Sequence, residues 1–114
     1  MRTFLIATFL FAFPTALSHA DKPAPVNFAK YKTALKIIAC ESGGRHIWSK
    51  VDFNPPTFGI SQFRSDTFYM LARQCAMPDA DWKNRDDQTA VTICAVELGK
   101  TKHWKASQSC WDRI

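Results

Sequence analysis

The sequence lacks several features that larger or membrane-anchored proteins have. No two of its four cysteines form a C-x-x-C pair, so the common zinc sites are excluded and we expect no metal. No long apolar run follows the first 20 residues, so no transmembrane anchor is expected. The chain has 114 residues, which is too short for a Rossmann domain or a TIM barrel. Internal repeats and low-complexity segments are also absent.

The first 20 residues, MRTFLIATFLFAFPTALSHA, have the parts of a secretory signal. Arg2 supplies a positive charge, Phe4 to Leu17 form an apolar region, and Ser18-His19-Ala20 places small residues at a plausible cleavage point. We therefore expect 1–20 to be a signal peptide and 21–114 to be a single small domain. Such a protein is exported, either to the periplasm or out of the cell.

The net charge of the chain indicates which kinds of partner it can bind. Lys and Arg together number 15 and Asp and Glu together number 10, a mild excess of positive charge. That excess suits an anionic cell wall or membrane surface, and it is too small to argue for nucleic acid. A solvated basic surface would explain it equally well. We expect a monomer with no cofactor, no nucleic-acid partner and no membrane insertion.

Hydrophobic residues at helical spacing predict three helices, over 28–41, 66–75 and about 85–98. Asn27, Ser65 and Asn84 are the expected N-caps, and glycines stop the first and third helices. The expected apolar face of the first helix consists of Phe28, Tyr31, Leu35 and Ile38, with Ala34 and Ile37 beside them. The expected apolar faces of the other two are Phe68, Leu71, Ala72 and Cys75, and then Val91, Cys94, Ala95 and Leu98.

Residues 45–64 have no helical period. They contain β-prone side chains on both sides of the breaker Asn54-Pro55-Pro56, which is typical of an irregular loop with a short hairpin at most. We therefore expect an α+β fold that is mainly α-helical.

The cysteines predict two disulfides, because an exported domain meets an oxidising compartment and the number of cysteines is even. Four cysteines allow three pairings. Cys75 and Cys94 fall on apolar helix faces, so we expect a bridge between the second and third helices. Cys40 would then pair with Cys110 and tie the basic, aromatic tail 100–114 to the first helix.

Glu41 is a candidate general acid on physical grounds. It stands at the C-terminal end of the first expected helix, where the helix dipole is negative, beside Ile37, Ile38 and Cys40. These surroundings disfavour the carboxylate and raise its pKa. A carboxylic acid that stays protonated near neutral pH can protonate a glycosidic bond. A solvated Glu at a frayed helix end is the alternative.

Two motifs in order sharpen this hypothesis. Glu41-Ser42 ends the first expected helix, Gly59-Ile60-Ser61-Gln62-Phe63 follows in the loop, and Thr67-Phe68 lies in the second helix. Over about residues 28–111 the chain resembles the soluble lytic transglycosylase type of the lysozyme-like superfamily. The resemblance implies a small lysozyme-like domain that acts on peptidoglycan glycan strands.

The resemblance also implies roles for individual residues. Glu41 would be the catalytic acid and later the base, and Ser42 would position it or the substrate. Gln62 would lie in the sugar-binding groove, with the backbone of Gly59 and Ile60 in its wall. A missing side chain at Gly59 would let a ligand approach closely, although an ordinary turn is an equal alternative. Separately, Trp48 is a candidate for stacking on a sugar ring, with core packing as its alternative.

In this family one carboxylate is enough, because the 6-hydroxyl of the muramyl sugar attacks its own C1 and gives a 1,6-anhydro product. A muramidase would instead use a second carboxylate to activate water. Asp52 in the loop is the main candidate for that role, and Asp66 is simpler to explain as a first-turn helix charge. A non-catalytic glycan-binding or antimicrobial module on the same fold is the third possibility.

The sequence departs from the family at one place. Larger members carry an Ala-Tyr-Asn-Ala-Gly-like stretch whose Tyr contacts the catalytic Glu, whereas the corresponding region here, 94–100, reads CAVELGK. The far wall of the groove is therefore unassigned, with Glu97 and Tyr31 as weak candidates. The physiological setting, including a secretion or envelope assembly as partner, stays open.

Overall fold

The computed structural model of the protein describes residues 28–51 and 53–114. Within these ranges the elements follow in the order α2 (Phe28–Ser42), α3 (Ser65–Gln74), α4 (Arg85–Glu97), the 3-10 segment η1 (Thr101–Ser107) and α5 (Gln108–Trp111). The predicted signal peptide lies outside the described residues. The mainly helical class is confirmed, and each of the three predicted helices is present within one or two residues of its expected bounds.

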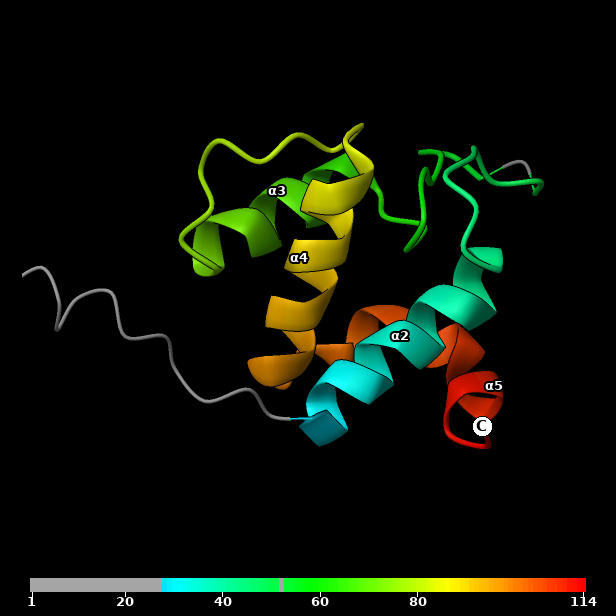
Figure 1. Ribbon diagram of the computed structural model, residues 1–114. Helices are drawn as coiled ribbons and strands as arrows, with labels where there is room; N and C mark the ends of the chain where they lie inside the picture. Colours follow the sequence, from blue (N-terminus) through cyan, green and yellow to red (C-terminus); the bar gives the residue numbers. More distant parts are fainter. Residues whose placement is uncertain (1–27, 52) are drawn as a thin grey trace, which may run out of the picture.

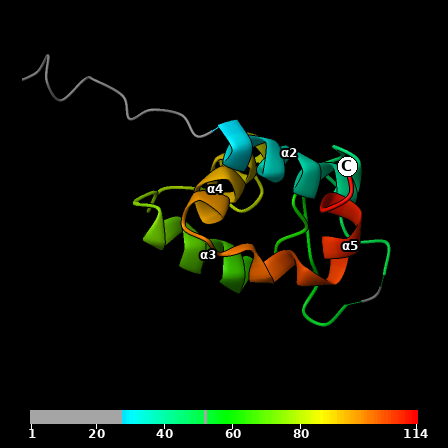
Figure 2. The same ribbon diagram turned by 90° about the horizontal axis from the view of Figure 1, so that it is seen from below.

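Helix α2 packs against α4, α5 and η1. It crosses α4 and has α5 near its C-terminal end, while α3 lies on the far side of α4 (Figures 1 and 2). Cys75–Cys94 joins the end of α3 to α4, and Cys40–Cys110 joins α2 to α5. Both bridges are the predicted ones. Each bridge joins one pair of helices, and the packing of α2 on α4 brings the two pairs together.

The core lies between these helices and the loop before α3. Phe63 is central to it, with ring centroids 5.5 Å from Phe68 and 5.4 Å from Trp104. Other buried members of the core come from every helix: Ala34, Ile37, Leu71, Val91, Ala95 and Trp111. The loop that carries the second motif is therefore anchored through Phe63 in the middle of the domain.

The helix ends that the structure describes follow the sequence with one exception, and the predicted cap Asn27 lies outside the described residues. The Asn84 side chain accepts a hydrogen bond of 2.9 Å from the backbone N–H of Asp87, which is the predicted cap. Gly43 takes a positive φ of 66° just after α2, and Gly99 takes one of 75° just after α4. The predicted cap Ser65 is wrong, because Ser65 is already helical and Arg64 precedes it without a side-chain cap bond.

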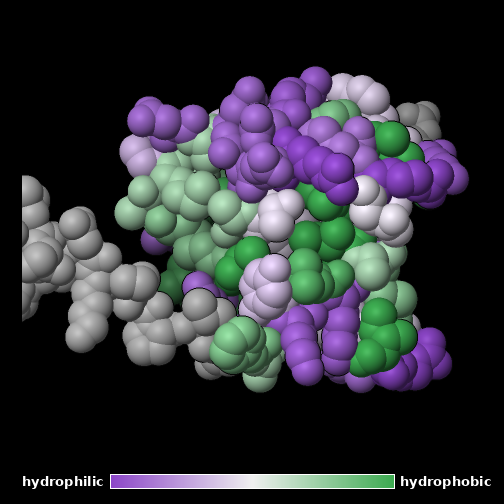
Figure 3. All heavy atoms as spheres, viewed as in Figure 1, coloured by the Kyte–Doolittle hydropathy of each residue, from purple (hydrophilic) through white to green (hydrophobic). Residues whose placement is uncertain are grey.

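The predicted apolar face of the first helix is confirmed for Ile38, which is buried, and is wrong for Phe28, Tyr31 and Leu35. Phe28 is 72% exposed and Leu35 is 42% exposed, while Ala34 and Ile37 are fully buried. The small side chain of Ala34 lies on the face that meets α4, where close packing favours it over a large residue. Hydrophobic residues consequently remain interspersed with hydrophilic ones on the lower half of the face in Figure 3, where α2 lies.

The loop contains less β-structure than predicted. Two isolated antiparallel bridges, Trp48 with Phe58 and Phe58 with Phe63, are present, and no strand is formed among the described residues. The sheet part of the α+β prediction is therefore not confirmed. Positive φ angles at Gly59 (95°) and Gln62 (53°) turn the chain back on itself at once, so a ladder cannot extend. No helix within the described ranges is long and apolar enough to cross a membrane.

Candidate functional site

The turn 58–63 is closed by the side chain of Gln62. Its Nε2 donates to the carbonyl oxygens of Ile47 at 3.0 Å and Gly59 at 2.9 Å. Its Oε1 accepts from the hydroxyl of Thr57 at 2.9 Å. These bonds hold Gln62 in its left-handed conformation, so this amide is used to shape the turn.

A second amide, that of Gln88 in α4, also holds this turn in place. Gln88 is fully buried, and its Nε2 donates to the carbonyl oxygens of Phe58 at 2.9 Å and Trp82 at 2.8 Å. Its Oε1 accepts from the backbone N–H of Ser61 at 3.2 Å. A Cβ on Gly59 would lie 2.2 Å from Nε2 of Gln88. The missing side chain at Gly59 therefore makes room for Gln88.

Ser42 connects the two motifs directly. It is buried, and its hydroxyl donates to the carbonyl oxygen of Ile60 at 2.7 Å. The backbone N–H of Ile60 donates to Nδ1 of His46 at 3.1 Å, and Nε2 of His46 lies 2.8 Å from the carbonyl oxygen of Lys83. The end of α2 and the residues just after it are thus joined directly to the turn by hydrogen bonds.

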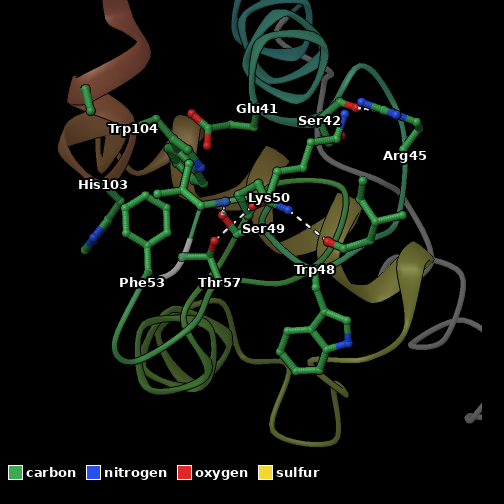
Figure 4. A pocket seen from close by; sticks show the side chains of 14 residues that line it. Glu41, Ser42, Arg45, Trp48, Ser49, Lys50, Phe53, Thr57, His103 and Trp104 are labelled. Carbon is green, nitrogen blue, oxygen red and sulfur yellow. Dashed lines mark hydrogen bonds between the residues drawn. The ribbon is translucent and has the colours of Figure 1, made fainter.

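A cavity of about 390 Å³ lies beside the end of α2 and the turn, and Figure 4 shows its side chains. We call it the Glu41 cavity. It is lined by residues of the end of α2, the loop and η1: Glu41, Ser42, Arg45, Ile47, Trp48, Ser49, Lys50, Val51, Phe53, Thr57, Gln62, His103, Trp104 and Ala106.

Most of the predicted site residues meet at this cavity. Glu41, Ser42, Trp48 and Gln62 line it, whereas the buried Gly59 and Ile60 are not among the lining residues. Asp52 lies outside the described residues. The weaker candidates Glu97, Tyr31 and Asp66 do not line the cavity. Contact of any of these residues with a sugar stays a prediction.

Glu41 is half-buried, and its carboxyl group faces the side chain of Ser107 from η1. In Figure 4 it points toward Trp104, on the opposite side from Arg45. Burial raises the pKa of Glu41, and the weaker effect of the Ser107 hydrogen bond lowers it. The direction agrees with the sequence prediction, and desolvation is the larger cause.

The Ser107 hydroxyl has two acceptors within reach, the Glu41 carboxylate and the carbonyl oxygen of Trp104 at 3.1 Å. A hydroxyl carries one proton, so it can donate fully to one of them at a time. When Glu41 is ionised, Ser107 can donate to it. When Glu41 is protonated, it can donate to Ser107, which then donates to Trp104. Both protonation states of Glu41 are therefore satisfied by the same arrangement.

The far wall of the cavity comes from η1, which sequence reasoning left unassigned. Trp104 is buried, and its Nε1 donates to the carbonyl oxygen of Ser61 at 3.0 Å. Burial and the nearby lysines Lys100 and Lys102 lower the pKa of His103, which favours its neutral form. Trp104, Ser107 and Trp111 stand at helical spacing in the tail, a signal that would have indicated an ordered segment.

Trp48 belongs to an aromatic cluster at the other end of the loop. Its ring centroid lies 4.8 Å from Phe58 and 5.8 Å from Trp82, and Nζ of Lys83 lies 4.6 Å from the Trp48 ring. Trp48 is 49% exposed, and in Figure 4 its indole points away from Glu41. It can therefore offer one edge to the cavity while it packs in the cluster.

The chemistry available in the Glu41 cavity is acid–base chemistry. Glu41 is the one carboxylic acid among the described lining residues. Across residues 28–51 and 53–114, no group of three His, Cys, Asp or Glu side chains is placed to hold a metal ion. Comparisons with models of known protein families, with curated proteins and with solved structures found no match.

Proposed function

We propose that the protein is an exported lytic transglycosylase with a lysozyme-like fold, which cleaves peptidoglycan strands and releases 1,6-anhydromuramyl products. The observation that carries the proposal is Glu41: a half-buried carboxylic acid with a raised pKa on the wall of a cavity of about 390 Å³. The Ser42–Ile60 hydrogen bond adds support, because it joins the two motifs of the resemblance beside that acid.

The proposed reaction uses Glu41 twice. The protonated carboxyl group gives its proton to the glycosidic oxygen after a muramyl residue, and that bond breaks. The resulting carboxylate accepts a hydrogen bond from Ser107. It then takes the proton of the muramyl 6-hydroxyl while that oxygen bonds to C1. Glu41 ends protonated, and no water is consumed.

Ser107 is the residue that contacts Glu41 from a later segment of the chain. In the resemblance, a Tyr on a later helix contacts the catalytic Glu. Here the contact to Glu41 is made by a hydroxyl from η1, next to the buried indole of Trp104. Ser107 is therefore proposed as the group that stabilises the carboxylate between the two proton transfers.

A muramidase is the second candidate, because Val51 and Phe53 line the Glu41 cavity and Asp52 stands between them in sequence. If Asp52 activates water, the products carry reducing ends and are heavier by one water than anhydro products. Asp52→Asn would then reduce the rate by roughly 100-fold or more. With a transglycosylase, the same change should alter the rate by less than about threefold.

The first prediction tests the acid itself. Glu41→Gln keeps the shape of the side chain and removes the transferable proton, so release of muropeptides should fall by roughly 10²–10⁴-fold. The measurement is the rate of product release from purified peptidoglycan, with products identified by mass spectrometry. Glu97→Gln, an exposed residue away from the cavity, is the matched control and should retain full activity.

A folded Glu41→Gln protein that clears peptidoglycan at the wild-type rate would contradict the catalytic role of Glu41.

If the wild type binds cell-wall strands but releases no fragments, even at high protein concentration, the chain is a glycan-binding module instead. Export, to the periplasm or the outside, is part of the proposal. The two disulfides agree with an oxidising compartment.

A further inference from the structure

The Glu41 cavity has a cationic side that the proposed acid–base reaction does not use. Arg45 and Lys50 are the Arg and Lys residues among its described lining residues, and both are exposed. The single ion pair within residues 28–51 and 53–114 joins Arg64 to Asp66. Arg45 and Lys50 therefore line the cavity without an ion pair to Glu41, the one carboxylic acid of its described lining.

Arg45 is oriented by the end of α2. Its Nε donates to the carbonyl oxygen of Ser42 at 3.2 Å, which leaves its two Nη groups available for a ligand. Figure 4 shows this arrangement beyond Ser42, on the opposite side of the cavity from Glu41. A guanidinium held by its Nε suits a planar anion that accepts two parallel hydrogen bonds, and a carboxylate has that geometry.

The proposed substrate supplies such a group, so this inference rests on the proposed function. The muramyl sugar whose C1 is attacked also carries, on its lactyl ether, a peptide with free carboxylates. That peptide leaves the same sugar ring on which Glu41 acts, so it must pass along the cavity or out of it. We infer that Arg45 and Lys50 bind a carboxylate of this stem peptide, and that the enzyme prefers peptide-bearing strands to bare glycan.

The test compares two substrates made from one preparation: uncrosslinked strands with their stem peptides, and the same strands after an amidase has removed the peptides. The double variant Arg45→Gln/Lys50→Gln should lose about tenfold in kcat/KM on peptide-bearing strands. On bare strands it should change by less than about twofold. Arg73→Gln/Lys32→Gln removes one Arg and one Lys outside the cavity and is the matched control, with no change expected on either substrate.

An equal loss on both substrates, or no loss on either, would overturn the inference. A binding measurement distinguishes failure of this inference from failure of the proposed function. Calorimetry on the Glu41→Gln protein compares a muramyl disaccharide with and without its peptide. Tighter binding of the peptide form, abolished by the Arg45 and Lys50 changes, supports the site even if no variant cleaves strands. Equal binding of both disaccharides contradicts it, whatever the activity.

Discussion

The two parts of the loop between α2 and α3 differ in how they are held. The bonded turn, residues 58–63, contains four buried residues and receives side-chain hydrogen bonds from α2, α4 and η1. The exposed loop, residues 48–51 and 53–56, presents Trp48, Val51 and Phe53 to solvent. The backbone N–H groups of Val51 and Phe53 donate within this loop, and that of Ser49 donates to the carbonyl oxygen of Thr57 at 3.0 Å.

The contrast separates two tasks. The residues of the second motif mostly hold the turn against the end of α2 and against α4, and of residues 59–63 Gln62 is the one that lines the Glu41 cavity. The exposed loop offers apolar side chains to the Glu41 cavity at little cost to the core. We therefore expect changes in the bonded turn and its supports to alter stability, and changes in the exposed loop to alter substrate handling.

The largest loss of stability is expected when a disulfide is removed. Cys40–Cys110 closes a sequence separation of 70 residues, and Cys75–Cys94 closes one of 19. Because the longer loop loses more unfolded-state entropy, Cys40→Ala/Cys110→Ala should lower the free energy of unfolding by about 4 kcal/mol, and Cys75→Ala/Cys94→Ala by about 3 kcal/mol. Urea unfolding measures both, and the reverse order would contradict the expectation.

Gly59→Ala should be next, with a loss of roughly 3 kcal/mol. A Cβ there clashes with the buried amide of Gln88, and its φ of 95° is unfavourable for a residue with a side chain. Gly43→Ala is the matched control, because Gly43 also has a positive φ but a Cβ on it meets nothing within 4 Å. It should cost only about 1–2 kcal/mol.

The clash can be isolated with a double-mutant cycle. In a Gln88→Ala background the cost of Gly59→Ala should fall to that of Gly43→Ala, because the atoms it meets have been removed. Strictly additive costs would show that the close approach of these two residues contributes nothing. The bonded turn would then owe its shape to its other contacts.

A smaller effect on the free energy of unfolding is expected when Glu41 is replaced. Its folded-state pKa is raised above the ordinary 4.5, so its contribution to stability is present below that value and is lost as pH rises through the raised pKa. Glu41→Gln should therefore be more stable than the wild type at neutral pH, by less than about 1 kcal/mol because the group is partly solvated. Urea unfolding below pH 4.5 should show no difference. A less stable variant at neutral pH would contradict this.

The smallest change in stability is expected in the exposed loop. Phe53→Ser should shift the free energy of unfolding by less than about 0.5 kcal/mol, because the side chain is already 49% exposed. It should nevertheless lower kcat/KM on peptidoglycan by about fivefold, since an apolar surface of the cavity is lost. Leu98→Ser, equally exposed but outside the cavity, should leave activity unchanged. Strong destabilisation by Phe53→Ser would break the contrast between the two parts.

Sequence patterns predicted what depends on short-range rules. Helix bounds, the Asn84 cap and the direction of the Glu41 pKa follow from neighbours a few residues away. The disulfide pairing followed once Cys75 and Cys94 had been placed on apolar helix faces. The face of α2 did not follow, because its apolar residues exceed the surface that α4, α5 and η1 cover, and only the packing selects among them.

The site residues that sequence reasoning missed are polar groups with distant partners. Gln88 looks like an interruption of an apolar stripe, yet it holds a turn about 30 positions earlier. Ser107 gives no signal by itself, and its partner Glu41 is 66 positions away. Such contacts are set by the tertiary arrangement, so a spacing rule within one helix cannot reveal them.

The contact between Ser107 and Glu41 has a consequence for the order in which the site is made. The ribosome adds Glu41 early and reaches Trp104 and Ser107 only after α4 is complete. Until η1 exists, the carboxyl group is more solvated, which lowers its pKa. This effect outweighs the missing Ser107 hydrogen bond, whose loss alone would raise the pKa. The raised pKa of the residue proposed for catalysis is thus acquired late in synthesis, from a segment that is not part of either motif.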